Sequence, residues 1–188
     1  MEKVTLFTRQ HNDAKKILMT DGVFRMKPEW ILKKYGDISD HYMKCYDWLT
    51  YASAKRVPKP SGVSYPIWCN ISEDYRLRPA PGESIFKLSV DKEKIIYFDS
   101  LKWDFILNQM YLAESTEDKE AFDEQLRKRG IANEFVLFSR DVARFHPDLI
   151  QKVRASWDRV FTIDEWNIFT VQANIWEFHA EDILEIME

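Results

Sequence analysis

Two hydrophobic periods alternate along this chain, and their order restricts its fold more than any other feature. An apolar period of two residues, which is typical of strands, recurs near both ends and in the middle. The predicted strands cover residues 4–10, 65–71, 84–90, 95–98 and 169–178, with a further apolar segment at 183–187. Helical spacing and capping residues mark the segments between them. The predicted helices cover residues 13–19, 28–35, 39–56, 100–113 and 147–160, with an ambiguous segment at 133–138.

The grouping of these elements predicts the fold class. Strands and helices follow one another in groups rather than as regular parallel βαβ units, so we expect an α+β fold. Its sheet should be small, mostly antiparallel and possibly split, with flanking helices. The length of 188 residues and a hydrophobic content of 45% suit one packed domain over residues 1–188. A charged helix whose only large apolar residues are Phe122 and Leu126 should form a surface excursion at about residues 114–130.

Charge and motif content narrow the functional classes. The 27 basic and 31 acidic residues are mixed along the chain and give a net charge of −4, so non-specific nucleic-acid binding is not expected. The chain has no long apolar run and no secretory signal at its start, which predicts a cytoplasmic protein without a membrane segment. Cys45 and Cys69 are far apart and the four histidines lack ligand spacing, so we expect buried cysteines and no metal site. Phosphate-loop, dinucleotide, nucleophile-elbow and zincin motifs are absent.

Polar residues on the first and last long strands form the main candidate site. In the last strand, Thr170, Gln172, Asn174 and Trp176 share one face, opposite an apolar face. The first strand carries Thr8 and Gln10 on one face and Arg9 on the other. Pairing of these two strands would place a cleft between them. The alternative is that these residues are ordinary solvent-facing strand residues and caps.

Five further residues allow two interpretations each. Trp68 and Trp176 stand on predicted strands beside asparagines, and either stack on a base or nicotinamide ring or pack within the sheet. Asp99 ends an apolar strand and is either an acid at a strand end or, preferably, the N-cap of the next helix. Arg76 and Arg78 lie in a proline-rich loop, where they either grip a phosphate or carboxylate or are simply exposed.

Several of these motifs resemble a bacterial family of proteins that carry a domain of unknown function. The resemblance rests on Thr8-Arg9-Gln10 near the start and Gln172-Ala173-Asn174-Ile175-Trp176 near the end. Between them come Pro66-Ile67-Trp68, Phe98-Asp99-Ser100 with Trp103, and Ser156-Trp157, in the expected order. The resemblance covers nearly the whole chain and implies no particular activity.

The chain also resembles the ADP-ribosyltransferase superfamily, in its first strand and helix and in the segment from Ala173 to Ile186. That resemblance implies an ADP-ribosyltransferase-like fold that binds NAD, as a substrate, or another nucleotide. It implies binding by Thr8, Arg9, Gln10, Trp68, Asn174 and Trp176, and catalysis by Gln172 and Glu177. The sequence departs from the superfamily where Thr8 replaces a histidine and Asn174 replaces the glutamate that stabilises positive charge at the ribose. Strand alternation places Glu177 on the opposite face of its strand from Asn174, and Arg9 on the opposite face from Thr8.

Two functions therefore remain open from the sequence. The first is an ADP-ribosyltransferase-like domain that binds NAD or a nucleotide, with or without transfer. The second is a non-enzymatic binding or regulatory protein, with a protein partner, in a bacterial or phage defence or toxin system. The missing carboxylate and the high aromatic content of 14% motivate the second.

Overall fold

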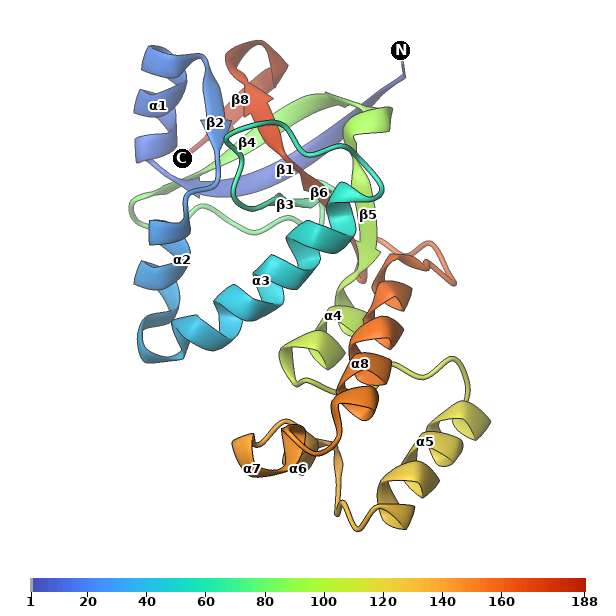
Figure 1. Cartoon of the computed structure of the whole chain (residues 1–188). Helices are drawn as coiled ribbons and strands as arrows, with labels where there is room; N and C mark the ends of the chain where they lie inside the picture. The colour runs from blue at the N-terminus through green and yellow to red at the C-terminus, as the bar shows by residue number, and fades with distance from the viewer. Residues whose placement is uncertain (1) are drawn as a thin grey trace. The chain divides into compact units, whose positions relative to one another are not determined.

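The computed structural model describes residues 2–188, which form two compact units (Figure 1). Unit 1 contains the described residues up to Phe98 together with Ile163–Glu188, and unit 2 contains Asp99–Thr162. The single domain over residues 1–188 stays a prediction. The helical excursion expected at 114–130 is part of unit 2, which extends well beyond it on both sides.

Unit 1 holds the strands and the first three helices. The strands are β1 (Lys3–His11), β2 (Val23–Arg25), β3 (Ile67–Asn70), β4 (Glu83–Asp91), β5 (Ile96–Asp99), β6 (Val171–Ile175), β7 (Glu177–His179) and β8 (Ile183–Met187). The helices are α1 (Asp13–Asp21), α2 (Pro28–Tyr35) and α3 (Ser39–Ala54), with short 3₁₀ turns at Gly36–Ile38, Lys92–Lys94 and Ala180–Asp182. The final residue of β5, Asp99, already belongs to unit 2. The sequence pattern did not predict β2, because three residues are too few to show a period.

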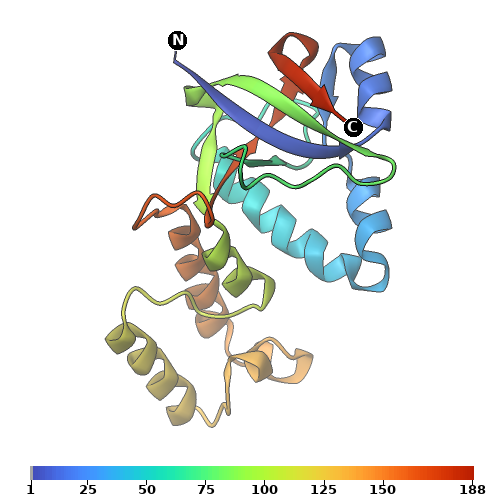
Figure 2. The ribbon, with the colours of Figure 1, turned by 180° about the vertical axis from the view of Figure 1, so that it is seen from behind.

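The strands form a six-stranded sheet in the order β5-β6-β3-β1-β4-β8 and a separate two-stranded sheet of β2 and β7. Strand β1 pairs antiparallel with β3 and β4, as do β3 with β6, β4 with β8, and β2 with β7. The pairing of β1 and β4 covers their whole length (Figure 2). The prediction of an α+β fold with a mostly antiparallel, split sheet is confirmed.

The predicted pairing of the first and last long strands is wrong. β3 lies between β1 and β6, since Asn70 is opposite Phe7 on one side and Gln172 on the other. β3 suits this central place because it carries apolar side chains on both faces, so the sheet can be covered on both sides there. The expected cleft between β1 and β6 is therefore filled by a strand.

The predicted strand at 169–178 is also wrong as a single element. It breaks at Trp176 into β6 and β7, and β7 pairs with β2 in the second sheet. The Trp176 side chain is buried and its Nε1 donates a hydrogen bond to the Val57 carbonyl at 2.9 Å. Beyond the bend, Phe178 packs against Phe24 and Phe86, with ring centroids 5.1 and 5.5 Å away. The hydrogen bond of Trp176 and the packing of Phe178 beyond it thus fix the break.

Unit 1 has an apolar core on one face of its large sheet. Residues of β1, β3, β4 and β6 contribute to it, and α1, β2 and β7 cover it. Cys45 and Cys69 are both buried, as predicted. Burial raises the pKa of Cys45 to about 11 and that of Cys69 to about 12, so both remain neutral thiols that pack like small apolar residues.

Unit 2 is helical. Its elements are α4 (Ser100–Leu107), α5 (Thr116–Lys128), α6 (Glu134–Leu137), α7 (Arg140–Ala143), α8 (Pro147–Ser156) and a 3₁₀ turn at Trp157–Phe161. The N-cap interpretation of Asp99 is confirmed, because its Oδ1 accepts from the Leu101 and Lys102 amides at 2.8 and 3.3 Å. α4 stops at Leu107 rather than at residue 113. Gln109, just beyond it, has a φ of 55°, a left-handed conformation that ends a helix.

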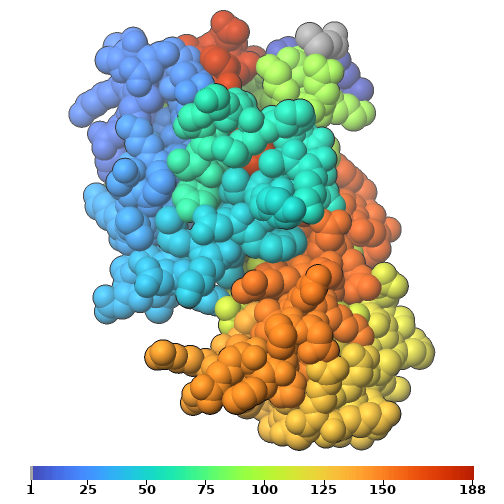
Figure 3. Space-filling model, in the orientation of Figure 1, coloured from blue at the N-terminus to red at the C-terminus, as the bar shows by residue number. Residues whose placement is uncertain are grey.

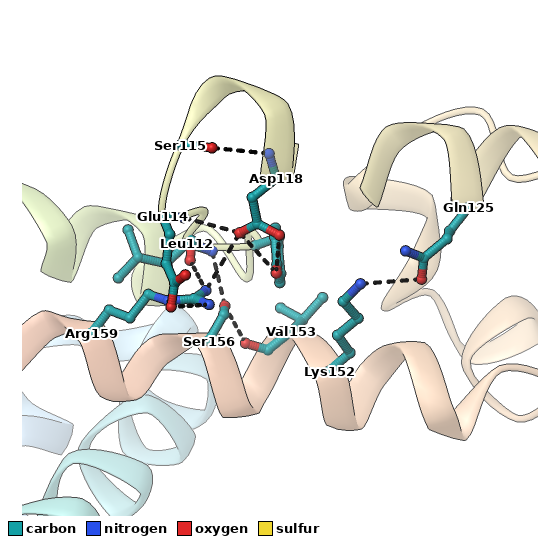
Figure 4. A network of polar contacts seen from close by, with 10 residues as sticks. Leu112, Glu114, Ser115, Asp118, Gln125, Lys152, Val153, Ser156 and Arg159 are labelled. Carbon is teal, nitrogen blue, oxygen red and sulfur yellow. Dashed lines mark hydrogen bonds and ion pairs between the residues drawn. The ribbon is translucent and has the colours of Figure 1, made fainter. Parts of the chain in front are cut away.

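A network of polar contacts holds the segment between α4 and α5 against α8 and the turn that follows it (Figure 4). Arg159 donates to the Leu112 carbonyl and, through Nη2, to Glu114 Oε1 at 2.8 Å. The Ser156 hydroxyl accepts from the Leu112 amide at 2.9 Å. Asp118 accepts from the Glu114 amide at 3.0 Å. The segment is therefore held at Leu112, at the Glu114 side chain and at the Glu114 amide.

Among residues 2–188, no helix combines the length and the apolar content needed to cross a membrane.

Candidate functional site

The sheet separates the predicted site residues onto two faces. Thr8 lies opposite Phe86, a core residue, so Thr8 and Gln10 point to the core face. Gln172 lies opposite Asn70, and Asn174 lies opposite Trp68. These two β6 residues therefore point to the other face, which we call the outer face. The structure brings Trp68, Gln172 and Asn174 together, but it separates them from the pair on β1.

Thr8 and Gln10 form a short buried chain of hydrogen bonds. Gln10 Nε2 donates to Thr8 Oγ1 at 2.8 Å, and Thr8 Oγ1 donates to the Trp68 carbonyl at 2.7 Å. Both side chains are buried. The hydroxyl thus ties β1 to β3, and its donor is already used. These contacts give the two residues a role in holding the sheet.

Arg9 and Glu177, the two charged candidates, are both engaged in ion pairs. Arg9 Nε lies 2.9 Å from Glu83, and its Nη1 donates to the Arg78 carbonyl at 3.3 Å. Arg9 thereby holds the loop between β3 and β4. Glu177 lies on β7, in the two-stranded sheet, with Arg25 Nε 2.7 Å away. The break at Trp176 therefore places Glu177 in a different sheet from Asn174.

The two tryptophans and Asn174 are packed inside unit 1. Trp68 meets Phe98 edge-on at 4.7 Å and Tyr46 of α3 at 6.1 Å. Trp176 is buried and hydrogen-bonded as described above. Asn174 is 0% exposed, and neither atom of its amide has a hydrogen-bond partner among the described residues. Trp68 is half-buried while Asn174 and Trp176 are buried, so a planar ligand has no open path to Asn174 or Trp176 in this structure.

Gln172 is half-buried, as are Arg9, Trp68 and Glu177, but its side chain takes part in none of the contacts described above. It lies at the end of β6 beside an exposed apolar surface. We call this the aromatic surface; its residues are Tyr75, Leu77, Trp166, Ile168 and Phe169. The Tyr75 and Phe169 rings meet edge to face at 4.3 Å, yet they are 53% and 55% exposed.

Two turns position the aromatic surface. The loop after β3 folds back on the sheet, where the Leu77 amide donates to Asn70 Oδ1 at 3.4 Å. The segment before β6 turns on Asn167, whose Oδ1 accepts from the Phe169 amide at 2.9 Å. Because Asn70 and Gln172 are paired, both turns emerge at the same end of β3 and β6. Sequence reasoning missed this surface, because its residues lie in two loops where no hydrophobic period exists.

The charged residues around the aromatic surface are mainly acidic. Its exposed acidic residues are Glu73, Asp74, Asp164 and Glu165, of which Glu73 is paired with Lys87 at 3.0 Å. Arg76 and Arg78 are the basic residues of the loop, and Arg76 Nη1 donates to the neighbouring Leu77 carbonyl at 3.4 Å. Their suggested role in binding phosphate stays a prediction.

Two hollows lie in unit 2 and involve none of the predicted site residues. One, of about 330 Å³, is lined by Phe105, Tyr111, Leu112, Ala113, Ser115, Thr116, Lys119 and Glu120. The other, of about 480 Å³, is lined by Ala143, Arg144, Pro147, Ile150, Gln151 and Arg154. The sequence signal for the second was available: four of its residues follow helical spacing on α8. Within residues 2–188, the histidine, cysteine and acidic side chains form no group of three that could hold a metal ion.

The fold is α+β, the polar candidates on its strands are largely internal, and two of its loops carry the exposed side chains of the aromatic surface. The chain belongs to the family described as a domain of unknown function (DUF3841), whose model matches residues 5–184. This confirms the resemblance that Thr8–Gln10 and Gln172–Trp176 predicted. Comparison with curated proteins gives no match, and comparison with solved structures gives none either.

Proposed function

We propose that the chain is a non-enzymatic binding protein that docks another protein on the aromatic surface of unit 1. The observation that carries this proposal is the pair of rings at Tyr75 and Phe169, which are more than half exposed although they contact each other. Clustered exposed apolar side chains are unfavourable in water and mark interaction sites in soluble proteins.

The geometry gives less support to ADP-ribosyl transfer. That reaction needs a carboxylate beside the ribose to stabilise positive charge as nicotinamide leaves. Asn174 is neutral and fully buried. Glu177 has its charge balanced by Arg25 and lies in the second sheet. Thr8 and Gln10 use their polar groups on each other and on β3, on the opposite face of the sheet.

The charge pattern indicates the chemistry of the partner. Acidic side chains dominate the rim, so a phosphate-rich ligand would be repelled. A protein with apolar anchors and basic residues around them would match both the rings and the rim. The partner is therefore defined as a basic protein surface with an apolar centre.

Binding of a nucleotide without transfer is the second candidate, and one observation favours it. The Gln172 side chain makes no hydrogen bond among the described residues, and it is half-buried close to the turns that carry Tyr75 and Phe169. A primary amide beside two rings can read the edge of a base while a ring stacks on it.

Photo-crosslinking distinguishes the two candidates. A benzophenone side chain is placed at Phe169, and at Tyr51 on α3 as a control that is 65% exposed. We expect a protein adduct from cells of the source organism at position 169 and none at 51. The adduct partner, once purified, should bind Phe169→Ala at least tenfold more weakly than wild type, and Tyr51→Ala equally well. Equal adducts at both positions would contradict protein docking, and loss of the adduct on adding NAD would favour the nucleotide.

A further inference from the structure

The hollow of unit 2 beside α7 and α8 is lined by residues that take no part in the proposed docking surface. α8 carries one stripe of buried residues, Leu149, Val153 and Ser156, which packs within unit 2. A second stripe at positions 147, 150, 151 and 154 follows the i, i+3, i+4, i+7 spacing of one helix face. Together with Ala143 and Arg144 at the end of α7, this stripe lines the 480 Å³ hollow, which we call the α7–α8 groove.

The centre of the α7–α8 groove is uncharged and largely apolar. Ala143, Pro147 and Ile150 supply its apolar lining, and Gln151 adds one amide. The stripe on α8 runs over eight residues, or about 10 Å from first to last, which corresponds to about two turns of a second helix. Figure 3 shows the outer surface of this segment, coloured orange, which is turned toward the viewer.

Two arginines give the groove its charge. Arg144 and Arg154 are exposed, and no ion pair among the described residues involves either of them. The nearby acid on α8, Asp148, is paired with Arg129 at 2.7 Å. The Arg144 guanidinium lies 4.5 Å from the ring centre of Phe145, which is 67% exposed. The groove therefore presents two guanidinium groups next to exposed apolar area, with the exposed acid Asp141 three residues before Arg144.

The geometry points to the α7–α8 groove as a binding site for an acidic amphipathic helix of a partner protein. Apolar side chains of that helix would cover Ile150 and Ala143, and its carboxylates would form bidentate pairs with Arg144 and Arg154. A polyphosphate or nucleic acid would satisfy the two arginines but would leave the apolar centre without a partner. This site is separate from the aromatic surface of unit 1 and selects the opposite charge.

Fluorescence anisotropy with defined peptides tests the proposal on the full chain. The probe is a labelled peptide of about 14 residues, two helical heptads of leucine and glutamate. A matched peptide has lysine in place of every glutamate. We expect saturable binding of the acidic probe, weakened by added salt, and at least tenfold weaker binding of the basic one.

Charge reversal on the protein assigns the binding to the groove. Arg144→Glu and Arg154→Glu should each weaken binding of the acidic probe about tenfold. Arg127→Glu on α5 is the matched control, because its side chain is 71% exposed and it makes the same charge change on the same unit. The control should change binding less than twofold, and circular dichroism should show that all three variants are folded.

Three results would overturn the proposal. Equal affinity for the acidic and basic peptides would remove the charge argument. Unchanged binding in both reversal variants would place the peptide elsewhere. Concentration-dependent self-association that Arg144→Glu abolishes would assign the groove to a second copy of this chain.

Discussion

Both units carry ion pairs near the surface, but the strands of unit 1 also bury uncharged polar side chains. In unit 1, Thr8, Gln10 and Asn174 are buried within the sheet, while rings such as those of Tyr75 and Phe169 face solvent from loops. In unit 2, the polar contacts include many ion pairs near the surface, such as Arg159 with Glu114, whose side chain is 71% exposed. Alternation along a strand therefore identifies which residues share a face, but it does not establish that a polar face is wet.

One buried side chain of unit 2 is an acid. Glu134 is 6% exposed, accepts a hydrogen bond from the Tyr111 amide and lies 2.9 Å from Lys119 Nζ. A buried carboxylate is stable only when it is paired and hydrogen-bonded. This residue therefore resembles the buried polar groups of unit 1 more than its neighbours on α5.

Removing Glu134 should have the largest effect on stability among the changes considered. Glu134→Ala leaves the Tyr111 amide unpaired and Lys119 without one of its partners, and should lower the free energy of unfolding by about 2–4 kcal/mol. Denaturant unfolding measures this loss. Glu124→Ala is the control, since it removes an exposed pair with Arg127 and should cost less than about 1 kcal/mol. Equal losses in the two variants would show that burial of Glu134 is unimportant.

Asn174 should behave in the opposite way. Its amide is fully buried without hydrogen bonds, so Asn174→Leu exchanges a desolvated polar group for an apolar one of similar size. We expect the free energy of unfolding to rise by about 1–2 kcal/mol. Asn174→Asp, which places a charge there, should lower it. A clear loss of stability in Asn174→Leu would mean that the amide is hydrogen-bonded in solution.

Asp118 should make unit 2 sensitive to acid. The Glu114 amide, followed by Tyr111 and Arg159, holds the pKa of Asp118 below its ordinary 3.8. A lowered folded pKa means that the stabilisation is present above pH 3.8 and is lost as the pH falls through the folded value. Melting temperatures of wild type and Asp118→Asn should therefore differ at neutral pH and converge below pH 3.8. A constant difference across that range would rule out this contribution.

Gln172 should have the smallest effect. It is half-buried and takes no part in the hydrogen bonds of Thr8 and Gln10. Gln172→Ala should change the free energy of unfolding by less than about 0.5 kcal/mol. Thr8→Val serves as the comparison, because it removes a buried hydrogen bond and should cost about 1–3 kcal/mol. A loss in Gln172→Ala as large as that in Thr8→Val would make Gln172 a structural residue.

Local patterns predicted the elements, and long-range packing decided the site. Alternation gave β1 and β4 nearly residue for residue, and the capping preference of aspartate gave the start of α4 at Asp99. Alternation continues through Trp176, so the local sequence does not predict the bend that the Trp176–Val57 hydrogen bond fixes. The position of β3 between β1 and β6 depends on pairing between residues about 60 and 100 positions apart. Burial of Asn174 follows from that pairing and from no property of its own segment.

We infer that Thr8 and Gln10 hold the sheet together and that the polar residues of the strands do not bind NAD. Isothermal titration of the full chain with NAD tests this most directly, because it needs no partner protein. We expect no saturable heat up to millimolar NAD, since Thr8 and Gln10 point to the core face and Asn174 and Trp176 are buried. Saturable binding at micromolar NAD that is lost in Gln172→Ala, with the melting temperature unchanged, would contradict it.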